Sequence, residues 1–398
     1  MRRIYSPVLL ANLPEARARA FVVLFTFDAI ARSILISVLP LKAYGLLGAA
    51  QLVSIAYFAA AFLGLGTNLS VPLLLRTLPR RWVLTIGAGI QVASVALLSL
   101  ESAWTFVLGL AMQGMAMAML DVAINLYMLD HIPRRELNTF EPRRLLFTGT
   151  TFALGPWLGV YLNGQINSNL AFVVAGMSAL SLLTFFWFLR LSDHSAVRTS
   201  GAQSPSPLKS IPRFVAQPRL LLSWCLALGR NGWWVMNFIY VPIYVTRAGY
   251  GPEAGGALVS LGLVAMLGVR MWGRLGQKIG IRNVLSIGYG CTGVLSLIAA
   301  ALAMAEQTTA CMVALWAAAV AATIIDGAGN VPFLRAVHHY ERAEMTSVFM
   351  TFRHVGSLVV PGVLALVLWV APFPAVFATG GLLTLGMALL SRLLPRGL

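Results

Sequence analysis

Long apolar stretches constrain this chain more than any other feature of its sequence. Apolar segments of roughly 19–26 residues recur from end to end, and a helix that crosses a bilayer needs ~20. Strands of a membrane β-barrel would be ~10 residues long with strict alternation, and the sequence does not alternate in this way. The sequence therefore predicts an all-α membrane protein with twelve transmembrane helices, near 21–41, 50–75, 82–100, 104–129, 145–163, 170–189, 220–244, 254–273, 284–305, 310–334, 346–369 and 375–394.

The charged residues agree with this class and indicate its orientation. Only 11% of the 398 residues are charged, against about 25% in soluble proteins. We number each loop by the span that it follows. Most Lys and Arg lie in the N-terminal segment, the even-numbered loops, the central linker and the C-terminus, whereas Lys42 and Arg247 lie in odd-numbered loops. Because cytoplasmic loops carry the excess of Lys and Arg, both termini are predicted to be cytoplasmic. The net charge of +16 therefore does not indicate nucleic-acid binding. The preference for Arg over Lys is typical of a GC-rich bacterial genome, so the expected location is the bacterial inner membrane.

The sequence contains an internal repeat. Four residues of the first half recur in the second half at one offset of 205 positions: Asp121, Asn125, Glu136 and Pro156 correspond to Asp326, Asn330, Glu341 and Pro361. Six spans in each half give both halves the same orientation, which is a parallel repeat about an axis along the membrane normal. Residues 190–219 are rich in Ser and Pro and predict a flexible cytoplasmic linker. The expected domains are therefore helical bundles at 1–189 and 220–398, joined by this linker.

Charged residues inside the apolar segments mark the candidate site. A charge in the bilayer costs a few kcal/mol, and such residues usually pair or face a water-filled pathway. The spans contain three acids and three arginines: Asp28, Asp121, Asp326, Arg32, Arg230 and Arg353. Asp28 and Arg32 are four residues apart and share a helix face. When Pro40 is matched with Pro242, Arg230 occupies the position equivalent to Asp28.

Further polar residues continue these helix faces. Gln113, Asp121 and Asn125 are separated by multiples of four on the fourth span, and Asp326 and Asn330 repeat the last two on the tenth. On the seventh span, Arg230, Trp234 and Asn237 follow one another at helical spacing. We expect these residues, with Arg353, to form a substrate and proton pathway. The alternative is that the charges form gate salt bridges or join helices without touching substrate.

Two motifs resemble those of the major facilitator superfamily. Gly273, Gln277, Lys278, Gly280 and Arg282 match its cytoplasmic G-x-L-x-D-R-x-G-R-R motif, with Gln277 in place of Asp. In the fifth span, Gly155, Pro156 and Gly159 resemble the core of the G-x-x-x-G-P-x-x-G motif of its antiporter branches. The equivalent loop after span two has lost most of its motif, and Leu110 stands where the span-four motif has Arg. The arginines of the cytoplasmic motif could instead serve only to set the membrane topology, and Pro156 could be a simple packing kink.

The resemblance covers essentially the whole chain and implies two six-helix bundles, with spans one, four, seven and ten lining a central cavity. It implies gate or hinge roles for the two motifs and for Pro361. The sequence has no P-loop, metal cluster or nucleophile–base pattern, so we expect neither an enzyme nor a cofactor. The leading hypothesis is a monomeric secondary transporter that exports a small organic molecule in exchange for protons by alternating access. The alternatives are a transporter of a carboxylate-bearing metabolite, such as an organic acid or siderophore-type chelator, and a transport-dead sensor with the same fold.

Overall fold

Every regular element of the described chain is helical. The computed structural model describes residues 14–132, 137–189, 207–338 and 341–395, and these contain no strand. Nine of the described helices are long and apolar enough to cross a membrane, and Pro252–Gly268 and Ala375–Ser391 are shorter apolar helices. The prediction of an all-α, multi-pass membrane protein is therefore confirmed. The number of twelve spans is consistent with this result and stays a prediction.

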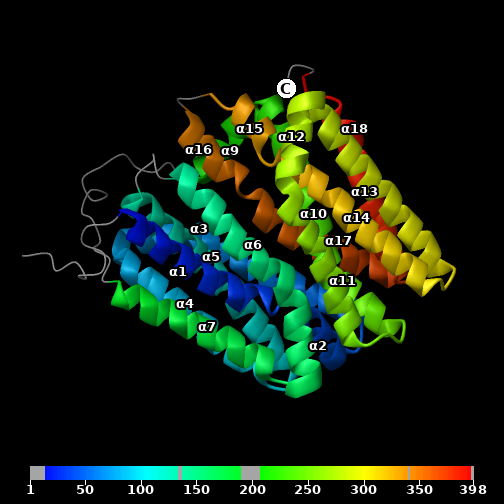
Figure 1. Ribbon diagram of the computed structural model, residues 1–398, viewed down its shortest axis with the longest axis horizontal. Helices are drawn as coiled ribbons and strands as arrows, with labels where there is room; N and C mark the ends of the chain where they lie inside the picture. The colour runs from blue at the N-terminus through cyan, green and yellow to red at the C-terminus, as the bar shows by residue number, and fades with distance from the viewer. Residues whose placement is uncertain (1–13, 133–136, 190–206, 339–340, 396–398) are drawn as a thin grey trace, which may run out of the picture. The chain divides into compact units, whose positions relative to one another are not determined.

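The helices follow the predicted apolar segments closely (Figure 1). In chain order, those of the N-terminal half are α1 (Pro14–Ser33), α2 (Val38–Leu47), α3 (Ala50–Thr77), α4 (Arg80–Ser99), α5 (Ala103–His131), α6 (Leu137–Tyr161) and α7 (Leu170–Phe188). Those of the C-terminal half are α9 (Pro207–Val215), α10 (Pro218–Arg247), α11 (Pro252–Val264), α12 (Val269–Ile279), α13 (Ile281–Met304), α14 (Thr308–Ala328), α15 (Val331–Ala336), α16 (Arg342–Phe349), α17 (Phe352–Val370) and α18 (Ala375–Ser391).

Contacts divide the chain into two compact units. The first unit comprises Met1–Leu39 and Ala59–Thr199, and the second comprises Pro40–Phe58 and Ser200–Leu398. Residues 40–58, which contain most of α2 and the beginning of α3, thus group with the C-terminal helices although they belong to the first half of the sequence. This grouping differs from the expected boundary at 189, because it follows spatial contacts rather than chain order.

Part of the expected linker is a helix. Residues 190–206 lie outside the described part of the chain, but Pro207–Val215 form α9. The Phe214 side chain is 2% exposed and packs in a buried cluster of the second unit. The expectation of a flexible linker throughout 190–219 is therefore wrong at its C-terminal end, where burial of an aromatic ring holds the backbone.

Four of the predicted spans are interrupted rather than continuous. A turn at 34–37 separates α1 from α2, and Ala265–Gly268 form a 3-10 turn between α11 and α12. Gly329, with φ of +54°, ends α14, a backbone conformation that glycine adopts without the penalty of a Cβ. A shorter turn separates α16 from α17. Two of these breaks lie next to residues of the candidate site, because Arg32 precedes the first turn and Asn330 follows Gly329.

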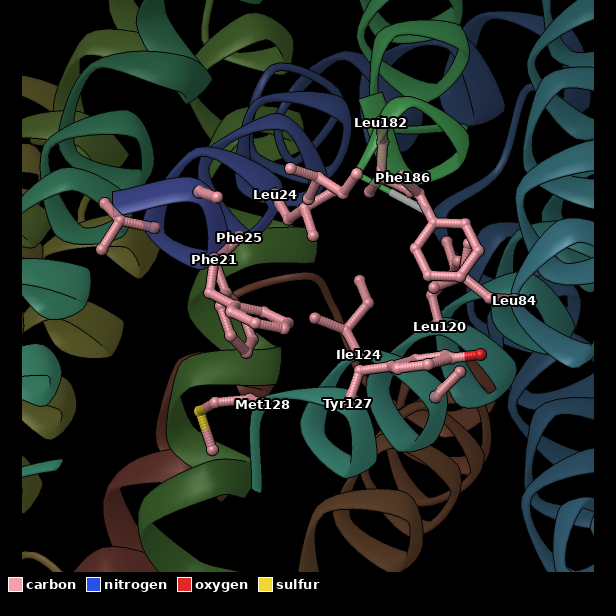
Figure 2. Close-up of a cluster of buried hydrophobic side chains, with 14 of the residues drawn as sticks. Phe21, Leu24, Phe25, Leu84, Leu120, Ile124, Tyr127, Met128, Leu182 and Phe186 are labelled. Carbon is pink, nitrogen blue, oxygen red and sulfur yellow. The ribbon is translucent and has the colours of Figure 1, made fainter. Parts of the chain in front are cut away.

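Buried apolar side chains fix the helices of the first unit against each other. Figure 2 shows Phe21, Leu24 and Phe25 of α1 in one cluster with residues of α4, α5 and α7. The rings of Tyr127 on α5 and Phe186 on α7 lie 5.1 Å apart, edge to face. Since lipid is as apolar as these side chains, close packing rather than water exclusion supplies the stabilisation in the bilayer. The cluster sets the register of α1 against α5, and so positions Asp28 relative to Asp121.

Two smaller clusters perform the same role in the second unit. One joins α9, α10 and the segment from α15 to α17 through Phe214, Phe333, Phe349 and Phe352, which are each at most 2% exposed. The other packs Leu226 of α10 against α13, α14 and the C-terminal end of the chain. These contacts place α10 beside the C-terminal end of α14, where Asp326 lies.

Candidate functional site

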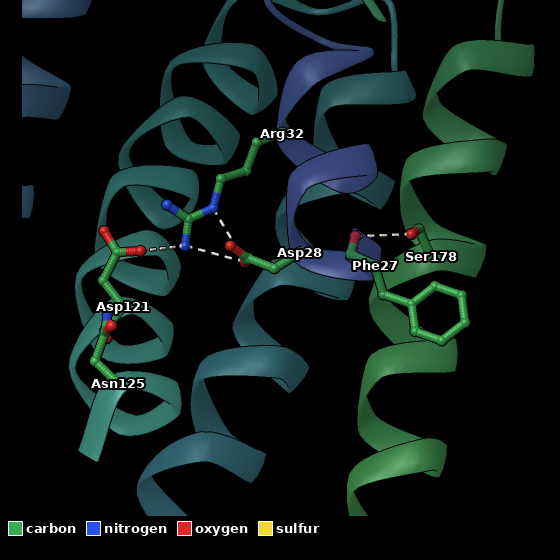
Figure 3. A network of polar contacts seen from close by, with 6 residues as sticks. All are labelled: Phe27, Asp28, Arg32, Asp121, Asn125 and Ser178. Atoms are coloured by element: carbon green, nitrogen blue, oxygen red, sulfur yellow. Dashed lines mark hydrogen bonds and ion pairs between the residues drawn. The ribbon is translucent and has the colours of Figure 1, made fainter. Parts of the chain in front are cut away.

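In the first unit, one arginine binds two carboxylates. Arg32 Nε donates a hydrogen bond of 3.0 Å to Asp28 Oδ1 on the same helix, and Arg32 Nη2 lies 2.8 Å from Asp121 Oδ1 on α5 (Figure 3). The side chains of Asp28 and Arg32 are 13% and 15% exposed, whereas that of Asp121 is 50% exposed. The three residues together carry one more negative than positive charge when both acids are ionised. Asp121 is the acid of this cluster that remains accessible.

Asn125 does not reach the arginine. Its Nδ2 donates a 2.7 Å hydrogen bond to the main-chain oxygen of Asp121, one turn earlier on α5, and its side chain lies beside Asp121 in Figure 3. Asn125 is exposed. The repeated Asp-x-x-x-Asn of this unit therefore lies on a continuous helix, and the side chains of both its Asp and its Asn are accessible.

The fifth-span motif packs against the turn that follows Arg32. A Cβ added to Gly155 would lie 2.5 Å from Ser33 Oγ, and one added to Gly159 would lie 1.9 Å from the main-chain oxygen of Ile34. No side chain larger than hydrogen fits at this distance, so both glycines are required for the close approach of the helices. Pro156 is buried between them, and α6 remains helical through it. The motif thus holds α6 tightly on the end of α1, directly beside the charged cluster.

In the second unit, two side chains of α10 bind one acid and the amide that follows it in the repeated motif. Arg230 Nε on α10 lies 3.6 Å from Asp326 Oδ1, and Arg230 Nη2 donates to Asn330 Oδ1 at 3.0 Å. Trp234 Nε1 donates a 2.9 Å hydrogen bond to Asp326 Oδ2. The side chains of Arg230 and Asp326 are only 13% and 16% exposed. This ion pair is balanced in charge and largely enclosed.

The two clusters use equivalent positions. With Pro40 matched to Pro242, position 28 corresponds to 230 and position 32 to 234. In both units, the side chain at the second of these positions (Arg32 or Trp234) donates to the repeated aspartate. At the first position, Asp28 contacts Arg32 in one unit and Arg230 contacts Asp326 in the other. The donor at the second position is therefore kept between the repeats, whereas the charge at the first position is reversed and the cation at the second is replaced by a neutral side chain.

The second copy of Asp-x-x-x-Asn crosses a helix break. Asp326 lies in the last turn of α14, Gly329 turns the chain, and Asn330 precedes α15. The break moves Asn330 out of the helix so that its Oδ1 can accept from Arg230. A small cavity of about 10 Å³, enough for about one water molecule, lies at this break and is lined by Arg230, Tyr289, Gly329 and Asn330 among others.

Comparison with known proteins assigns the family. The sequence profile of the Major Facilitator Superfamily matches residues 21–361. The chain belongs to the Major Facilitator Superfamily. It is therefore a membrane transporter of the major facilitator type, as the motifs in span five and between spans eight and nine predict. None of the curated proteins matches the sequence significantly.

Solved transporters of the same fold support this assignment. The nucleoside transporter NupG aligns with 94% of this chain and 97% of its own, with a TM-score of 0.71 and 14% identity. A POT family transporter in complex with 5-aminolevulinic acid covers 94% of both chains with a TM-score of 0.73 and 10% identity. A bacterial homologue of the iron transporter ferroportin, in an inward-facing state, covers 96% of this chain and 97% of its own with a TM-score of 0.68 and 15% identity. At these identities the likeness establishes the major facilitator fold alone.

The cytoplasmic motif of this major facilitator protein lies at the junction of α12 and α13. Gly280 has φ of +85° and joins the two helices, and its main-chain nitrogen donates to Gly276 at 3.0 Å. This positive φ explains the glycine of the motif. Lys278 is exposed and Arg282 half-buried. Gly273 lies within α12, and the side chain of Gln277 lies outside the described residues.

Four predicted pathway or hinge residues lie away from the two charged clusters. Gln113 is buried against α4, where its Oε1 accepts a 3.0 Å hydrogen bond from Ser94. Asn237 is 2% exposed, and its Nδ2 has no hydrogen-bond partner among the described residues. Arg353 is exposed at the start of α17, 5.8 Å from the centroid of the Phe352 ring. Pro361 is buried within α17.

Sequence reasoning did not foresee three features of the site. It did not identify Trp234 as a hydrogen-bond donor to Asp326, although the 202-residue match of Pro40 with Pro242 would have paired it with Arg32. The helix breaks follow sequence signals that were not used to predict them: Gly329 at one break, and at 34–37 the nearby Pro40, which has no N–H to donate to the oxygen of Ile36. Glu341 was noted only as a repeated residue, and its contacts with α9 were unexpected. Among the described residues, no three His, Cys, Asp or Glu side chains are grouped so as to hold a metal ion.

Proposed function

We propose that this major facilitator protein is a secondary active transporter that exports a small organic molecule in exchange for protons, with Asp121 as the principal proton carrier. The observation that carries the proposal is the contrast in exposure between the repeated acids. Asp121 is 50% exposed and shares one arginine with Asp28. Asp326 is 16% exposed and is held by Arg230 and Trp234.

Asp121 has the properties that a proton carrier needs. The acid must exchange protons with water and must tolerate both protonation states. Protonation of Asp121 leaves Arg32 with a full partner in Asp28, so the cluster becomes neutral rather than losing its ion pair. Protonation of Asp326 would leave Arg230 without the carboxylate that it faces at 3.6 Å, which is unfavourable for an enclosed cation. The second cluster therefore suits a structural ion pair.

Export, rather than uptake, is supported by the fifth-span motif. Gly155 and Gly159 belong to the motif by which this chain resembles the antiporter branches of the family. The same two glycines let α6 pack closely against the end of α1. The alternative of a carboxylate-bearing substrate relied on three membrane arginines. Arg32 and Arg230 both engage acids of the protein itself, so that alternative loses two of its three binding groups.

Everted membrane vesicles test the proposal directly. A pH gradient is generated by respiration and followed with a fluorescent amine, and tetraphenylphosphonium, uridine, dialanine and citrate are added in turn. We expect at least one compound to dissipate the gradient in vesicles containing the wild-type protein but not in those with Asp121→Asn. Compound-dependent proton movement that persists in Asp121→Asn would exclude Asp121 as carrier. Glu101→Gln, which removes an exposed acid beyond α4, is the charge-matched control.

The proposal includes the membrane and topology inferred from the sequence. We expect a monomer in the bacterial inner membrane with both termini in the cytoplasm. Single cysteines at Glu101, Glu253 or Glu306 should react with an impermeant maleimide added to intact cells, whereas cysteines at 195–210 should react only after lysis. The reverse labelling pattern would exclude this orientation.

A further inference from the structure

A buried carboxylate outside the charged site joins the linker helix to the second unit. Glu341 directly precedes α16, and its side chain is 5% exposed. Its Oε1 accepts a hydrogen bond from Arg213 Nη2 of α9, and its Oε2 accepts one of 3.0 Å from Gln217 Nε2. Arg213 Nη1 also lies 3.9 Å from Glu344. Because a buried carboxylate needs a cation and hydrogen-bond donors, α9 and the residue pair that follows it supply what Glu341 requires.

The helix α9 depends on this docking. It has nine residues and contains Pro212, and helices this short are not stable alone in water. Its anchors are the Phe214 ring, which is 2% exposed, and the contacts of Arg213. The other face is open, since Ile211 and Val215 are 39% and 50% exposed. A helix held by one ring and one ion pair can be released without opening a large core.

The docked segment extends to the charged site of the same unit. Phe333 of α15 stacks on Phe349 of α16 with ring centroids 4.1 Å apart, and Phe349 lies 5.3 Å from Phe352. The Arg230 guanidinium lies 5.8 Å from the centroid of Phe352 and donates to Asn330. These two contacts of Arg230, unlike its ion pair with Asp326, thus involve residues 330–352. Glu341 lies at the middle of this segment and is the point where α9 holds it.

We propose that Glu341 is a positioning residue for transport: by binding Arg213 and Gln217 it docks α9 on residues 330–352 and so fixes the geometry of Arg230, Asn330 and Asp326. The inference rests on the proposed transport function for its effect on turnover, but not for the docking itself. Undocking of α9 frees the segment from α15 to α16 and lets Arg230 lose its alignment with Asn330. The linker between the halves therefore acts on the second charged site without touching it.

Distance measurements between spin labels test the docking independently of transport. Cys225, Cys291 and Cys311 are first replaced, and labels are placed at Ile211 and Arg335, which are both exposed. We expect one narrow distance distribution in the parent protein and a broad one in both Glu341→Gln and Arg213→Glu. The charge-swapped double variant, Arg213→Glu with Glu341→Arg, should restore the narrow distribution. Arg219→Glu, which changes an exposed arginine in the first turn of α10, should leave it narrow.

Transport kinetics test the positioning role. Glu341→Gln should lower turnover roughly tenfold with a KM within about twofold of the parent, because the substrate still binds but the site is misaligned. The swapped variant should recover most of that turnover. A narrow distribution and parental turnover in Glu341→Gln would overturn the proposal, and so would broad distances with unchanged turnover. If the parent protein shows no transport, the proposed function fails while the distance data still decide whether Glu341 docks α9.

Discussion

The two copies of Asp-x-x-x-Asn have the same spacing but opposite local arrangements. In the first unit, Asp121 lies on a continuous helix, is half-exposed, and shares Arg32 with Asp28. In the second unit, Asp326 lies before a helix break, is largely enclosed, and forms a balanced pair with Arg230. The duplicated motif has therefore been kept while its surroundings have diverged.

The difference indicates a division of labour between the halves. An acid with a shared arginine can gain and lose a proton while the ion pair survives, whereas an acid in an exclusive pair cannot. Because the position equivalent to Arg32 is Trp234, the second half supplies a neutral donor where the first supplies a cation. Under the proposed function, the first copy of the motif exchanges protons and the second copy holds its unit together.

The largest expected effect compares the loss of stability when one charged side chain is removed from each cluster. Arg230→Ala leaves Asp326 enclosed without its cation, which typically costs ~3–5 kcal/mol. Asp121→Ala should cost under ~1 kcal/mol, as for exposed pairs, because Arg32 keeps Asp28. Thermal unfolding of the purified variants in detergent, with expression level as a second readout, measures both.

A double substitution provides the control for this prediction. Arg230→Ala combined with Asp326→Ala removes both charges and should be more stable than Arg230→Ala alone. Equal losses of stability in Arg230→Ala and Asp121→Ala, with no recovery in the double variant, would contradict the claim that the two charged clusters differ in their contribution to stability.

The next effect concerns the neutral donor in the second unit. Trp234→Phe keeps an aromatic ring but loses the 2.9 Å hydrogen bond to Asp326. A hydrogen bond to a charged group contributes about 1.5–3 kcal/mol, so we expect a clear decrease in melting temperature. Trp233→Phe loses a bond to Ser296 instead, which joins neutral groups, and should cost less. A larger decrease in melting temperature for Trp233→Phe than for Trp234→Phe would mean that the hydrogen bond from Trp234 contributes little to the stability of the Asp326 site.

The packing of span five on span one gives a smaller, steric effect. Gly159→Ala would place a Cβ 1.9 Å from the oxygen of Ile34, and overpacking of this kind costs about 1–3 kcal/mol. The matched control is Gly290→Ala on α13, where an added Cβ meets nothing within 4 Å. That substitution should stabilise slightly, because alanine favours helix over glycine. The two melting temperatures should therefore shift in opposite directions, and a shift of the same sign in both would contradict the close approach.

The smallest effect distinguishes the two asparagines. Asn125 donates only to the main chain of its own helix, so Asn125→Ala should change stability by less than ~0.5 kcal/mol. Asn330→Ala removes the acceptor for Arg230 and should cost more. If Asn125→Ala is the more damaging of the two, Asn125 has a contact in the folded protein beyond its own helix.

Much of this arrangement could be predicted from the sequence because the bilayer restricts the choices. Length and hydropathy located the helices, and the cost of a charge in lipid identified Asp28, Asp121 and Asp326 as residues that need partners. The pairing of Asp28 with Arg32 follows from helix spacing alone, and the structure has that contact at 3.0 Å.

The partners across helices could not be predicted, because they depend on how the helices rotate against one another. The spacing of Gln113 placed it with Asp121, yet it is buried against α4 with Ser94. The sequence left Arg32, Arg230 and Arg353 open as partners of the repeated acids, and the packing of α10 beside α14 pairs Arg230 with Asp326. The turn at 34–37 lies just before Pro40, which has no N–H to donate to the main-chain oxygen of Ile36, and Gly155 and Gly159 pack against the start of this turn.

Labelling with dicyclohexylcarbodiimide tests the central claim most directly, since this apolar reagent modifies carboxyl groups that take up a proton in a membrane environment. Modified residues are mapped by peptide mass spectrometry at several pH values, with Asp121→Asn as the blank and Glu101 as a loop acid that should stay unmodified. The account predicts labelling at Asp121, with Asp326 unmodified while Arg230 is present. Labelling of Asp326 without labelling of Asp121 would contradict it.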